Sequence, residues 1–417
     1  MLRKIFFLAF WVTLCLPLAT NGQDRNVIWL HGLNSSGSDW QGFQSQFTGP
    51  SGTFRMASIT PSTYTSSAGI QQYVNGIVAV NLNNANNFAN RPITIAHSMG
   101  GVAARRADLQ GVANLGGLIT VGAPLDGAGI ASTINVGIAQ AAVEDGITQA
   151  SKGPLAQLIP LPFVNSILIT EMIDKLRSSG TLNLNAGAIG QTSVNDLQLA
   201  GGITADMNAN PTNLPKVSIF GNEESPVHWN IATTTADLRL FGNQVDLAVA
   251  ADIAEDIYYT MFIVDIVAGC VSIAIGWWNP WGWVGAAIFF WQADQWKQGY
   301  DWLCDSERMW NVLIGSSVAT GQCITYQAYI CYYPSTSSSC WQTRTNCFTS
   351  QLTGKSDGFI AATSQTGFNS ASWVGVPQVE ALGVNHFEEI DVNNAVMQSK
   401  FAQIFDDPLT YFSTGRR

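Results

Sequence analysis

Residues 91–101 read RPITIAHSMGG, and this stretch decides the fold. Its β-branched apolar part at 93–95 predicts a short buried strand, and its closing pair of glycines allows a helix to begin at once. Ser98 therefore lies on a sharp turn between a strand and a helix, where small neighbours relieve crowding around a strained backbone. Such a turn holds a serine hydroxyl clear of the main chain. Its common form is Gly-x-Ser-x-Gly, in which Ala96 here replaces the first glycine.

The sequence on both sides of this turn alternates between strand-like and helix-like segments. Apolar runs predict strands over 27–30, 56–59, 92–96 and 118–121. Residues at helical spacing predict helices over about 38–47, 68–82 and 102–109. Ser38 is expected to cap the first helix, and Pro61 is expected to end the second strand. The short loops between these segments predict an α/β protein with a doubly wound, mostly parallel sheet and helices on both faces.

Catalytic groups in such a sheet belong at the carboxyl ends of its strands. Three segments fall there, namely His-Gly-Leu at 31–33, Ser98, and Gly-Ala-Pro at 122–124. A strand at 216–221 and a final helix near 392–405 resume the pattern later in the chain. The predicted organisation is a core of residues 23–125, 211–224 and 351–417, a helical cap over 126–210, and an apolar, Trp- and Cys-rich insertion over 225–350.

The N-terminus has the pattern of a secretory signal peptide. Arg3 and Lys4 precede an apolar run over 5–18 and a small-residue exit over 19–22. The apolar run is too short to span a membrane comfortably. Cys15 lacks the small preceding residue that a lipid anchor would want. We therefore expect cleavage of residues 1–22 and a secreted, extracellular or cell-surface-associated protein.

Composition restricts the partners and the chemistry. Only 12% of the 417 residues are charged and the net charge is −10, which argues against nucleic acid as a partner. The seven cysteines include no Cys-x-x-Cys pair, and the chain has only four histidines. We therefore expect no metal centre and no cofactor. A structural calcium ion is compatible with the sequence, which specifies no site for it.

The cysteines outside the signal peptide form an even set, which predicts disulfide bonds in an exported protein. They are Cys270, Cys304, Cys323, Cys331, Cys340 and Cys347. Cys270 lies in an apolar segment where a buried free thiol is also ordinary. The sequence does not choose among the connectivities of the set.

A serine nucleophile needs a base, and the four histidines are the candidates. His97 adjoins the serine but is expected to be structural, because neighbouring side chains in such a turn point apart. His31 ends the first strand, where its backbone is more useful than its ring, and His228 lies within the insertion. His386 lies in a loop leading to the last helix, which suits the chain order Ser, Asp, His.

The acid that orients this base is expected at Asp357. The residue begins an Asp-Gly dipeptide, which is also a common turn sequence. Glu223 and Glu224, directly after the strand at 216–221, are the competing acids. The spacing ahead of His386 favours Asp357.

Together these motifs resemble those of secreted α/β-hydrolases of the bacterial lipase/esterase type. The matching pieces are residues 31–33, 96–101, 121–124, 357–358 and 385–386, and the resemblance covers about 27–124, 216–222 and 355–405. One departure is Ala-Pro-Leu at 123–125, where the family has Thr-Pro-His. The other departure is the unusually large second insertion.

The resemblance implies a role for each residue of the site. Ser98 would be the nucleophile, His386 the general base and then the general acid, and Asp357 the carboxylate that orients the base. The backbone N–H groups of Leu33 and Met99 would form the oxyanion hole.

The implied function is that of a secreted lipase or carboxylesterase, with an ester or lipid as substrate. An acyltransferase or phospholipase on the same triad is the alternative among enzymes, and a non-catalytic surface-binding protein is the alternative outside them. The apolar segment at 258–296 allows three interpretations. It could be a buried helical hairpin in the cap or at a subunit interface, a lid or lipid-contacting surface, or a membrane anchor.

Overall fold

A computed structural model provides the three-dimensional structure of the chain. It describes residues 25–47, 56–62, 66–77, 92–113, 115–135, 190–199, 201–224, 310–316, 321–329, 341–349 and 354–406, together with isolated positions between 227 and 301. The predicted signal peptide at 1–22 lies outside the described residues, and so does nearly all of the apolar segment at 258–296. Among the helices that are described, none is both long enough and apolar enough to cross a membrane.

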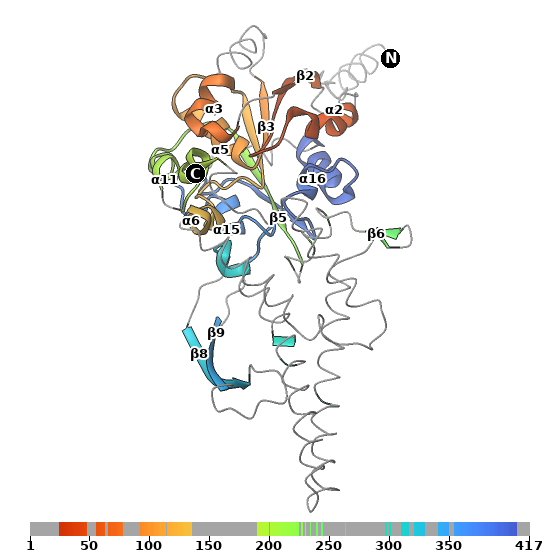
Figure 1. The fold of residues 1–417 in the computed structure, drawn as a ribbon. Coiled ribbons are helices and arrows are strands. Elements are labelled where there is room, and N and C mark those ends of the chain that lie inside the picture. Colours follow the sequence, from red (N-terminus) through yellow and green to blue (C-terminus); the bar gives the residue numbers. More distant parts are fainter. Residues whose placement is uncertain are drawn as a thin grey trace, which may run out of the picture.

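A six-stranded sheet forms the centre of the described fold (Figure 1). Its strand order is β10-β5-β4-β3-β1-β2, and every neighbouring pair is parallel. The strands are β1 (Arg25–Leu30), β2 (Met56–Ser62), β3 (Ile93–His97), β4 (Gly117–Val121), β5 (Lys216–Asn222) and β10 (Gln378–Leu382). Parallel neighbours require crossover connections, and here the connecting segments carry helices on both faces of the sheet.

Alternate residues of the strands enter two separate cores. Ile28 and Leu30 of β1 belong to one cluster of buried side chains, and Val27 and Trp29 belong to the other. Because successive side chains of a strand point to opposite faces, each face of the sheet carries its own core. The first is covered by α3 (Ile70–Ile77), α5 (Met99–Leu109), α6 (Gly129–Asn135), α10 (Gln191–Asp196) and α11 (Gly202–Ala209). The second is covered by η1 (Gly37–Trp40), α2 (Gln41–Phe47) and α16 (Ala395–Asp406).

The second core is built on aromatic contacts. The ring of Trp29 lies 4.8 Å from that of Trp40 and 6.2 Å from that of Phe401, and Phe43 lies 5.1 Å from Phe401. The indole N–H of Trp40 donates to the carbonyl of Leu30 at 3.0 Å, so a buried polar group is satisfied at the end of β1. The doubly wound, parallel α/β architecture predicted from the sequence is confirmed.

Two local predictions were wrong. β2 continues through Pro61, which lies opposite Trp29 of β1. β2 is the last strand of the sheet, and a proline is tolerated on an edge strand because its missing N–H can face away from the neighbour. The cap of η1 is Ser36 rather than Ser38, and its side chain accepts from the backbone N–H of Ser38.

The described parts of the two predicted insertions differ in how they relate to the sheet. Helices α6, α10 and α11 of the segment at 126–210 contribute buried side chains to the same core as α3 and α5. By contrast, β8 (Gly321–Tyr329) and β9 (Trp341–Thr349) form a separate antiparallel pair, which is drawn apart from the main sheet in Figure 1. In its register Cys323 lies directly opposite Cys347. The predicted disulfides remain predictions, and the other cysteines lie outside the described residues.

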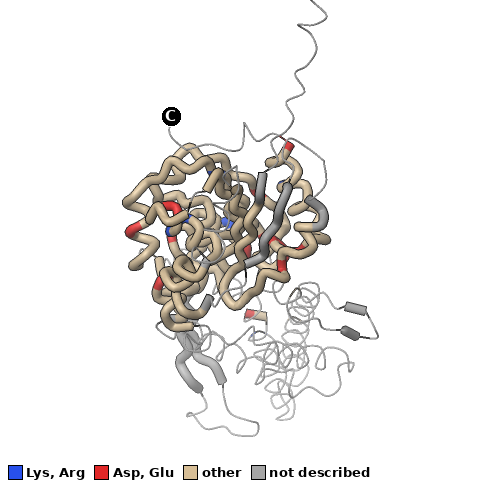
Figure 2. The backbone as a smooth tube through the Cα atoms, turned by 90° about the horizontal axis from the view of Figure 1, so that it is seen from above, with Lys and Arg blue, Asp and Glu red and all other residues tan. Residues whose placement is uncertain are grey.

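Charged side chains are sparse in the described core. Figure 2 shows the positions of the charged residues scattered along the backbone, and no cluster of Lys and Arg positions is visible in the described part of the tube. This agrees with the composition of the whole chain, in which only 12% of the residues are charged.

Candidate active site

Ser98 occupies a strained turn between β3 and α5. Its φ of 52° and ψ of −130° lie outside the regions that residues with a Cβ prefer. A conformation of this kind costs about 1–3 kcal/mol and persists only where the surroundings fix it. Here the N–H of Ser98 donates to the carbonyl of Val121 at 2.9 Å, and its carbonyl accepts from Gly101 at 3.0 Å. The turn is therefore held by both the neighbouring strand and its own helix.

Close approach of the backbone explains the glycines around Ser98. A Cβ on Gly100 would lie 2.6 Å from the carbonyl oxygen of His31, so only glycine lets α5 begin against the end of β1. A Cβ on Gly32 would lie 2.8 Å from the Cβ of Ser98. The backbone that follows β1 is thus packed directly beside the serine.

Three side chains from distant parts of the chain form one hydrogen-bonded series. Ser98 Oγ lies 3.0 Å from His386 Nε2, and His386 Nδ1 lies 2.7 Å from Asp357 Oδ2. Because a carboxylate can only accept, we assign the proton of the imidazole to Nδ1, which leaves Nε2 as the acceptor for the serine hydroxyl. The sequence placed these three residues in separate segments far apart in the chain, and the fold brings them together.

Backbone contacts fix Asp357 and His386 relative to each other. Asp357 Oδ1 accepts from the N–H of Phe359 at 2.9 Å and of Ile360 at 2.6 Å. The N–H of His386 donates to the carbonyl of Asp357 at 2.9 Å. The carboxylate therefore has one oxygen occupied by the main chain, and only the other oxygen remains for the imidazole.

Both residues predicted to donate to the oxyanion lie near Ser98, Met99 as its neighbour in the sequence and Leu33 through the packing of Gly32. Met99 is the first residue of α5, and Leu33 follows the glycine that packs against Ser98. Within the described part of the chain, neither of these N–H groups has a hydrogen-bond partner. A helix N-terminus also favours negative charge near its first N–H groups.

The competing acids do not contact the imidazole in the described structure. The carboxylate of Glu223 accepts from the N–H of Glu224 at 2.8 Å and from the side-chain amide of Asn230 at 3.4 Å. Of the three acids that the sequence offered, Asp357 is the one whose carboxylate lies against the imidazole, at 2.7 Å from His386 Nδ1.

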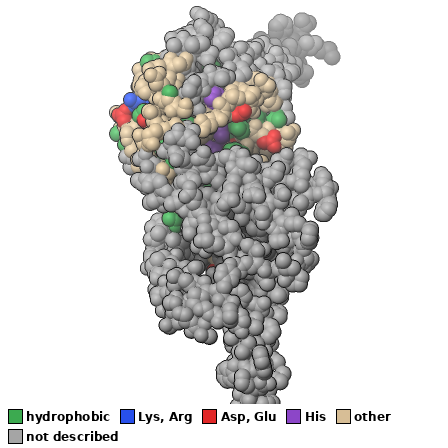
Figure 3. Space-filling view, in the orientation of Figure 1, with side chains coloured by type: hydrophobic (Ala, Val, Ile, Leu, Met, Phe, Trp, Pro, Cys, Tyr) green, Lys and Arg blue, Asp and Glu red, His purple; other side chains and the backbone are tan. Residues whose placement is uncertain are grey.

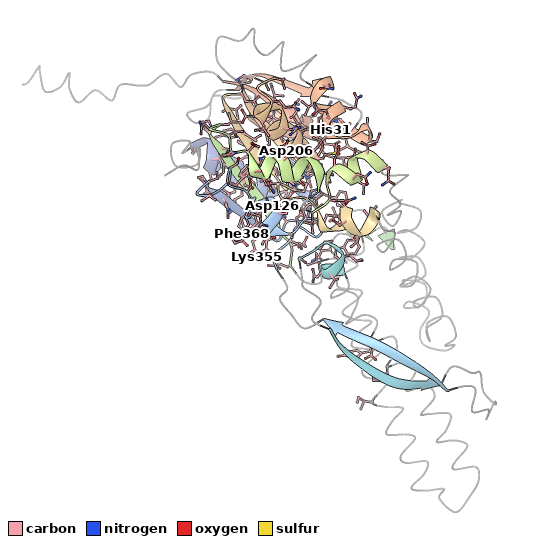
Figure 4. The ribbon with its side chains drawn as sticks, turned by 90° about the vertical axis from the view of Figure 1, so that its left-hand side faces the viewer. His31, Asp126, Asp206, Lys355 and Phe368 are labelled. Carbon is pink, nitrogen blue, oxygen red and sulfur yellow. The ribbon has the colours of Figure 1, made fainter. Side chains whose placement is uncertain are left out.

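The other histidines have different surroundings. His31, labelled in Figure 4, is buried after β1, and its Nδ1 lies 2.9 Å from the carbonyl oxygen of Gly32. His97 lies under the base, with its ring 4.5 Å from the ring of His386. Its Nε2 lies 3.1 Å from the backbone carbonyl oxygen of His386, so this contact holds the main chain of His386 in place. His228 lies outside the described residues.

Sequence reasoning missed Glu389, which is fully buried beside His386. Its Oε2 lies 3.4 Å from His386 Nδ1 and 3.2 Å from His97 Nε2. Its Oε1 accepts from the N–H of Gly221 at 3.0 Å, near the carboxyl end of β5. A signal existed in the spacing, because Glu389 follows His386 by three residues and can share one side of a helical turn with it.

The two carboxylates determine the electrostatics of the site. Burial lowers the pKa of His386, but the charges of Asp357 and Glu389 and their hydrogen bonds outweigh burial and raise this pKa to about 10. Burial works to raise the pKa of Glu389, yet hydrogen bonds from His386 and His97 outweigh it and hold the pKa below its usual range. For Asp357 burial dominates and raises the pKa against the attraction of the imidazole. Burial lowers the pKa of His97, which favours a neutral ring.

A metal ion would have one cluster of ligands among the described residues. The ligand atoms of His97, His386 and Glu389 lie within 4.8 Å of one another. His386 Nδ1 lies 2.7 Å from Asp357 Oδ2 and 3.4 Å from Glu389 Oε2, so the cluster shares its contacts with Asp357. The cluster is therefore part of the hydrogen-bonded series around the base, and we assign no metal to it.

Comparison with known proteins gives similarity to hydrolases at low identity. No protein-family model and no curated protein matches the sequence. Among solved structures, the mature lipase BlEst2 of Bacillus licheniformis is 15% identical with a TM-score of 0.29, and the match covers 57% of this chain and 91% of the lipase. The peroxisomal α/β-hydrolase Lpx1 of Saccharomyces cerevisiae is 13% identical with a TM-score of 0.28, covering 48% of this chain and 64% of that one.

A third match is the phospholipase PlaB of Legionella pneumophila, which is 12% identical with a TM-score of 0.29. It covers 49% of this chain, and this chain spans less than half of the phospholipase, 41% of its length. Identities and TM-scores of this size do not assign the chain to a family. Functional conclusions therefore depend on the geometry around Ser98.

Proposed function

We propose that the chain is a serine hydrolase of the α/β-hydrolase type that cleaves carboxylic esters through an acyl-enzyme on Ser98. The observation that carries this proposal is the hydrogen-bonded series from Ser98 Oγ through His386 to Asp357, at 3.0 and 2.7 Å. A nucleophile, a base and an orienting acid in this order are the parts that acyl transfer requires.

The proposed reaction begins when Ser98 Oγ attacks the ester carbonyl while His386 Nε2 accepts the hydroxyl proton. The tetrahedral oxyanion is stabilised by the N–H groups of Leu33 and Met99, and loss of one such donor costs about 3 kcal/mol of barrier. The intermediate collapses as His386 passes the proton to the departing alcohol. Water then attacks the acyl-enzyme with the same base, which releases the acid and restores Ser98.

The chain's own groups supply every step, so we propose no cofactor for the reaction. The signal-peptide pattern at 1–22 supports a secreted or cell-surface-associated enzyme. Product analysis in the presence of an added alcohol separates hydrolysis from acyl transfer, because an acyltransferase forms a new ester from the same acyl-enzyme.

The proposal is tested by labelling with a fluorophosphonate, which reacts with an activated serine. We expect the folded protein to be labelled on Ser98, as located by peptide mapping, and the heat-denatured protein to remain unlabelled. Activation depends on the base 3.0 Å away, which denaturation removes. A folded protein that takes no label, as the surface-binding alternative requires, would contradict the proposal. Labelling of a different serine would contradict it as well.

The pH dependence of kcat/KM is expected to show the influence of both carboxylates on the base. His386 accepts a proton only when it is neutral, and its pKa is raised to about 10 from an ordinary value of 6.5. Activity should therefore increase with pH in a range above pH 6.5, since kcat/KM reports the free enzyme. Glu389→Gln removes one negative charge beside the imidazole, so the pKa of His386 should fall and the acid limb should move to lower pH.

The matched control is Glu380→Gln, because Glu380 is on β10 and pairs with Lys355 at 2.6 Å instead of with the base. That variant should leave the acid limb in place. Thermal unfolding of both variants shows whether the buried glutamine is accommodated. A folded Glu389→Gln enzyme with an unmoved acid limb would contradict this account of the site.

A further inference from the structure

A row of aromatic side chains borders the base on one side. The ring of Phe359 lies 6.0 Å from the ring of His386, and that of Phe387 lies 6.3 Å from it. Phe359 and Phe387 meet edge to face at 5.4 Å, and Trp310 meets Phe359 in the same way at 5.7 Å. These three side chains, which we call the aromatic row, form one continuous apolar surface that reaches His386.

One end of the aromatic row is packed against the protein core, and the other end is exposed. The indole N–H of Trp310 donates to the carbonyl of Gly358 at 2.7 Å, and Trp310 and Phe359 pack partly buried against the first core. Phe387 is 39% exposed, although it directly follows the proposed base. Figure 3 shows histidine side chains at the surface of the described part of the molecule, with hydrophobic and acidic side chains next to them. A large aromatic exposed beside a reactive group offers a place for an apolar ligand group.

The chemistry of ester cleavage decides which part of a substrate would meet this surface. The carbonyl oxygen must point toward the N–H groups of Leu33 and Met99, which lie in the loop after β1 and at the start of α5. The departing oxygen must lie near His386 Nε2, because that nitrogen gives it the proton. The alcohol part of the ester thus leaves from the side of Ser98 on which His386 lies, and two rings of the aromatic row lie 6.0 and 6.3 Å from the ring of His386.

We propose that the aromatic row binds the alcohol part of the substrate and gives the enzyme a preference for esters of apolar, aryl-bearing alcohols. This inference rests on the proposed function, because it takes Ser98 as nucleophile and His386 as the acid for the leaving group. Phe359 and Phe387 are the specificity-determining residues, and Trp310 positions Phe359. Contact of an aryl group with two phenylalanine rings is the favourable interaction that an ethyl group cannot make.

Two pairs of esters separate the alcohol side from the acyl side. 2-Phenylethyl acetate and ethyl acetate differ only in the alcohol, whereas ethyl 3-phenylpropanoate and ethyl acetate differ only in the acyl group. Both alcohols are primary alkanols, so the intrinsic reactivity of the leaving group is nearly constant. We expect kcat/KM for 2-phenylethyl acetate to exceed that for ethyl acetate by about tenfold or more, since one apolar group in a binding site is worth at least that factor.

Phe387→Ala and Phe359→Ala should each reduce this alcohol preference several-fold and leave the ratio for the acyl pair within about twofold of the parent enzyme. The control is Phe368→Ala, which removes an aromatic ring that is 74% exposed and makes no ring contact with His386 in the described structure. Both ratios should be unchanged in that variant.

Three results would overturn the inference. If the enzyme cleaves ethyl acetate but neither phenylalanine variant changes the alcohol ratio, the aromatic row does not bind the alcohol and the proposed function stands. If the variants change the acyl ratio instead, the row binds the acyl group. If the parent enzyme cleaves none of the three esters and Ser98 takes no fluorophosphonate, the proposed function fails and the inference fails with it.

Discussion

Ser98→Ala is expected to reduce kcat/KM for p-nitrophenyl esters by about a millionfold while the protein remains folded. The substitution removes the only atom that forms the acyl-enzyme in the proposed reaction. Among the described residues, the hydroxyl of Ser98 is the group hydrogen-bonded to His386 Nε2, at 3.0 Å. The measurement is the hydrolysis rate of purified variant and parent under identical conditions, with circular dichroism as the check on folding.

The fold is expected to tolerate this change because alanine keeps the Cβ and the backbone. The strained φ of 52° is imposed by the main-chain bonds of Ser98 to Val121 and Gly101, which the substitution leaves intact. We therefore expect the free energy of unfolding to change by less than about 1 kcal/mol. Retention of more than a small fraction of activity in Ser98→Ala would eliminate Ser98 as the nucleophile.

Ser364→Ala is the control, because we expect it to lower stability and leave activity nearly unchanged. The hydroxyl of Ser364 donates to the carbonyl of Gly127 and accepts from the N–H of Asp126 at 3.3 Å. Its loss leaves buried polar groups without a partner, which costs about 1–3 kcal/mol of stability. Activity per folded molecule should be nearly unchanged, so the two serine variants separate a chemical role from a structural one.

The parts of the fold that sequence could predict are those with strong local patterns. The strands next to Ser98 are short, apolar and β-branched, and the glycines after Ser98 permit the immediate start of α5. The passage of β2 through Pro61 was not predictable in the same way. It depends on β2 being the last strand, and strand order is a property of the whole sheet.

The site shows the same division between local and distant information. Ser98, His386 and Asp357 could be proposed because each has a recognisable residue type in a recognisable order at the end of a strand or in a late loop. Glu389 could not be selected, because Glu388 precedes it and either could have faced the base. The short helix at Glu388–Ile390 turns Glu389 inward, where it is fully buried, and leaves Glu388 partly exposed.

Asp357→Asn is expected to reduce kcat/KM by about ten-thousandfold, because it changes which nitrogen of His386 carries the proton. Oδ1 of Asp357 accepts two main-chain N–H groups, from Phe359 and Ile360. In the variant the amide oxygen must stay at that position, so the NH₂ group is directed at His386 Nδ1. An N–H donor facing Nδ1 makes this nitrogen an acceptor and moves the imidazole proton to Nε2. The base then has no lone pair for the hydroxyl of Ser98.

Glu389 does not replace the lost acid in this expectation. Its Oε2 lies 3.4 Å from His386 Nδ1, compared with 2.7 Å for Asp357, and it also lies 3.2 Å from His97 Nε2. Asparagine has the shape of aspartate, so the variant should fold, and its thermal unfolding is the check on that. The measurement is kcat/KM over a range of pH in which both the variant and the parent enzyme are folded.

The control is Glu223→Gln, since Glu223 is the rival acid in the sequence and its carboxylate bonds to Glu224 and Asn230. Its kcat/KM should stay within about twofold of the parent. A larger loss in Glu223→Gln than in Asp357→Asn would reverse the assignment of the acid. Asparagine and aspartate have the same shape, so the parent enzyme and Asp357→Asn differ in the chemistry of this side chain and not in the shape of the site. A ten-thousandfold loss confined to Asp357→Asn would therefore mean that the carboxylate fixes which nitrogen of His386 carries the proton.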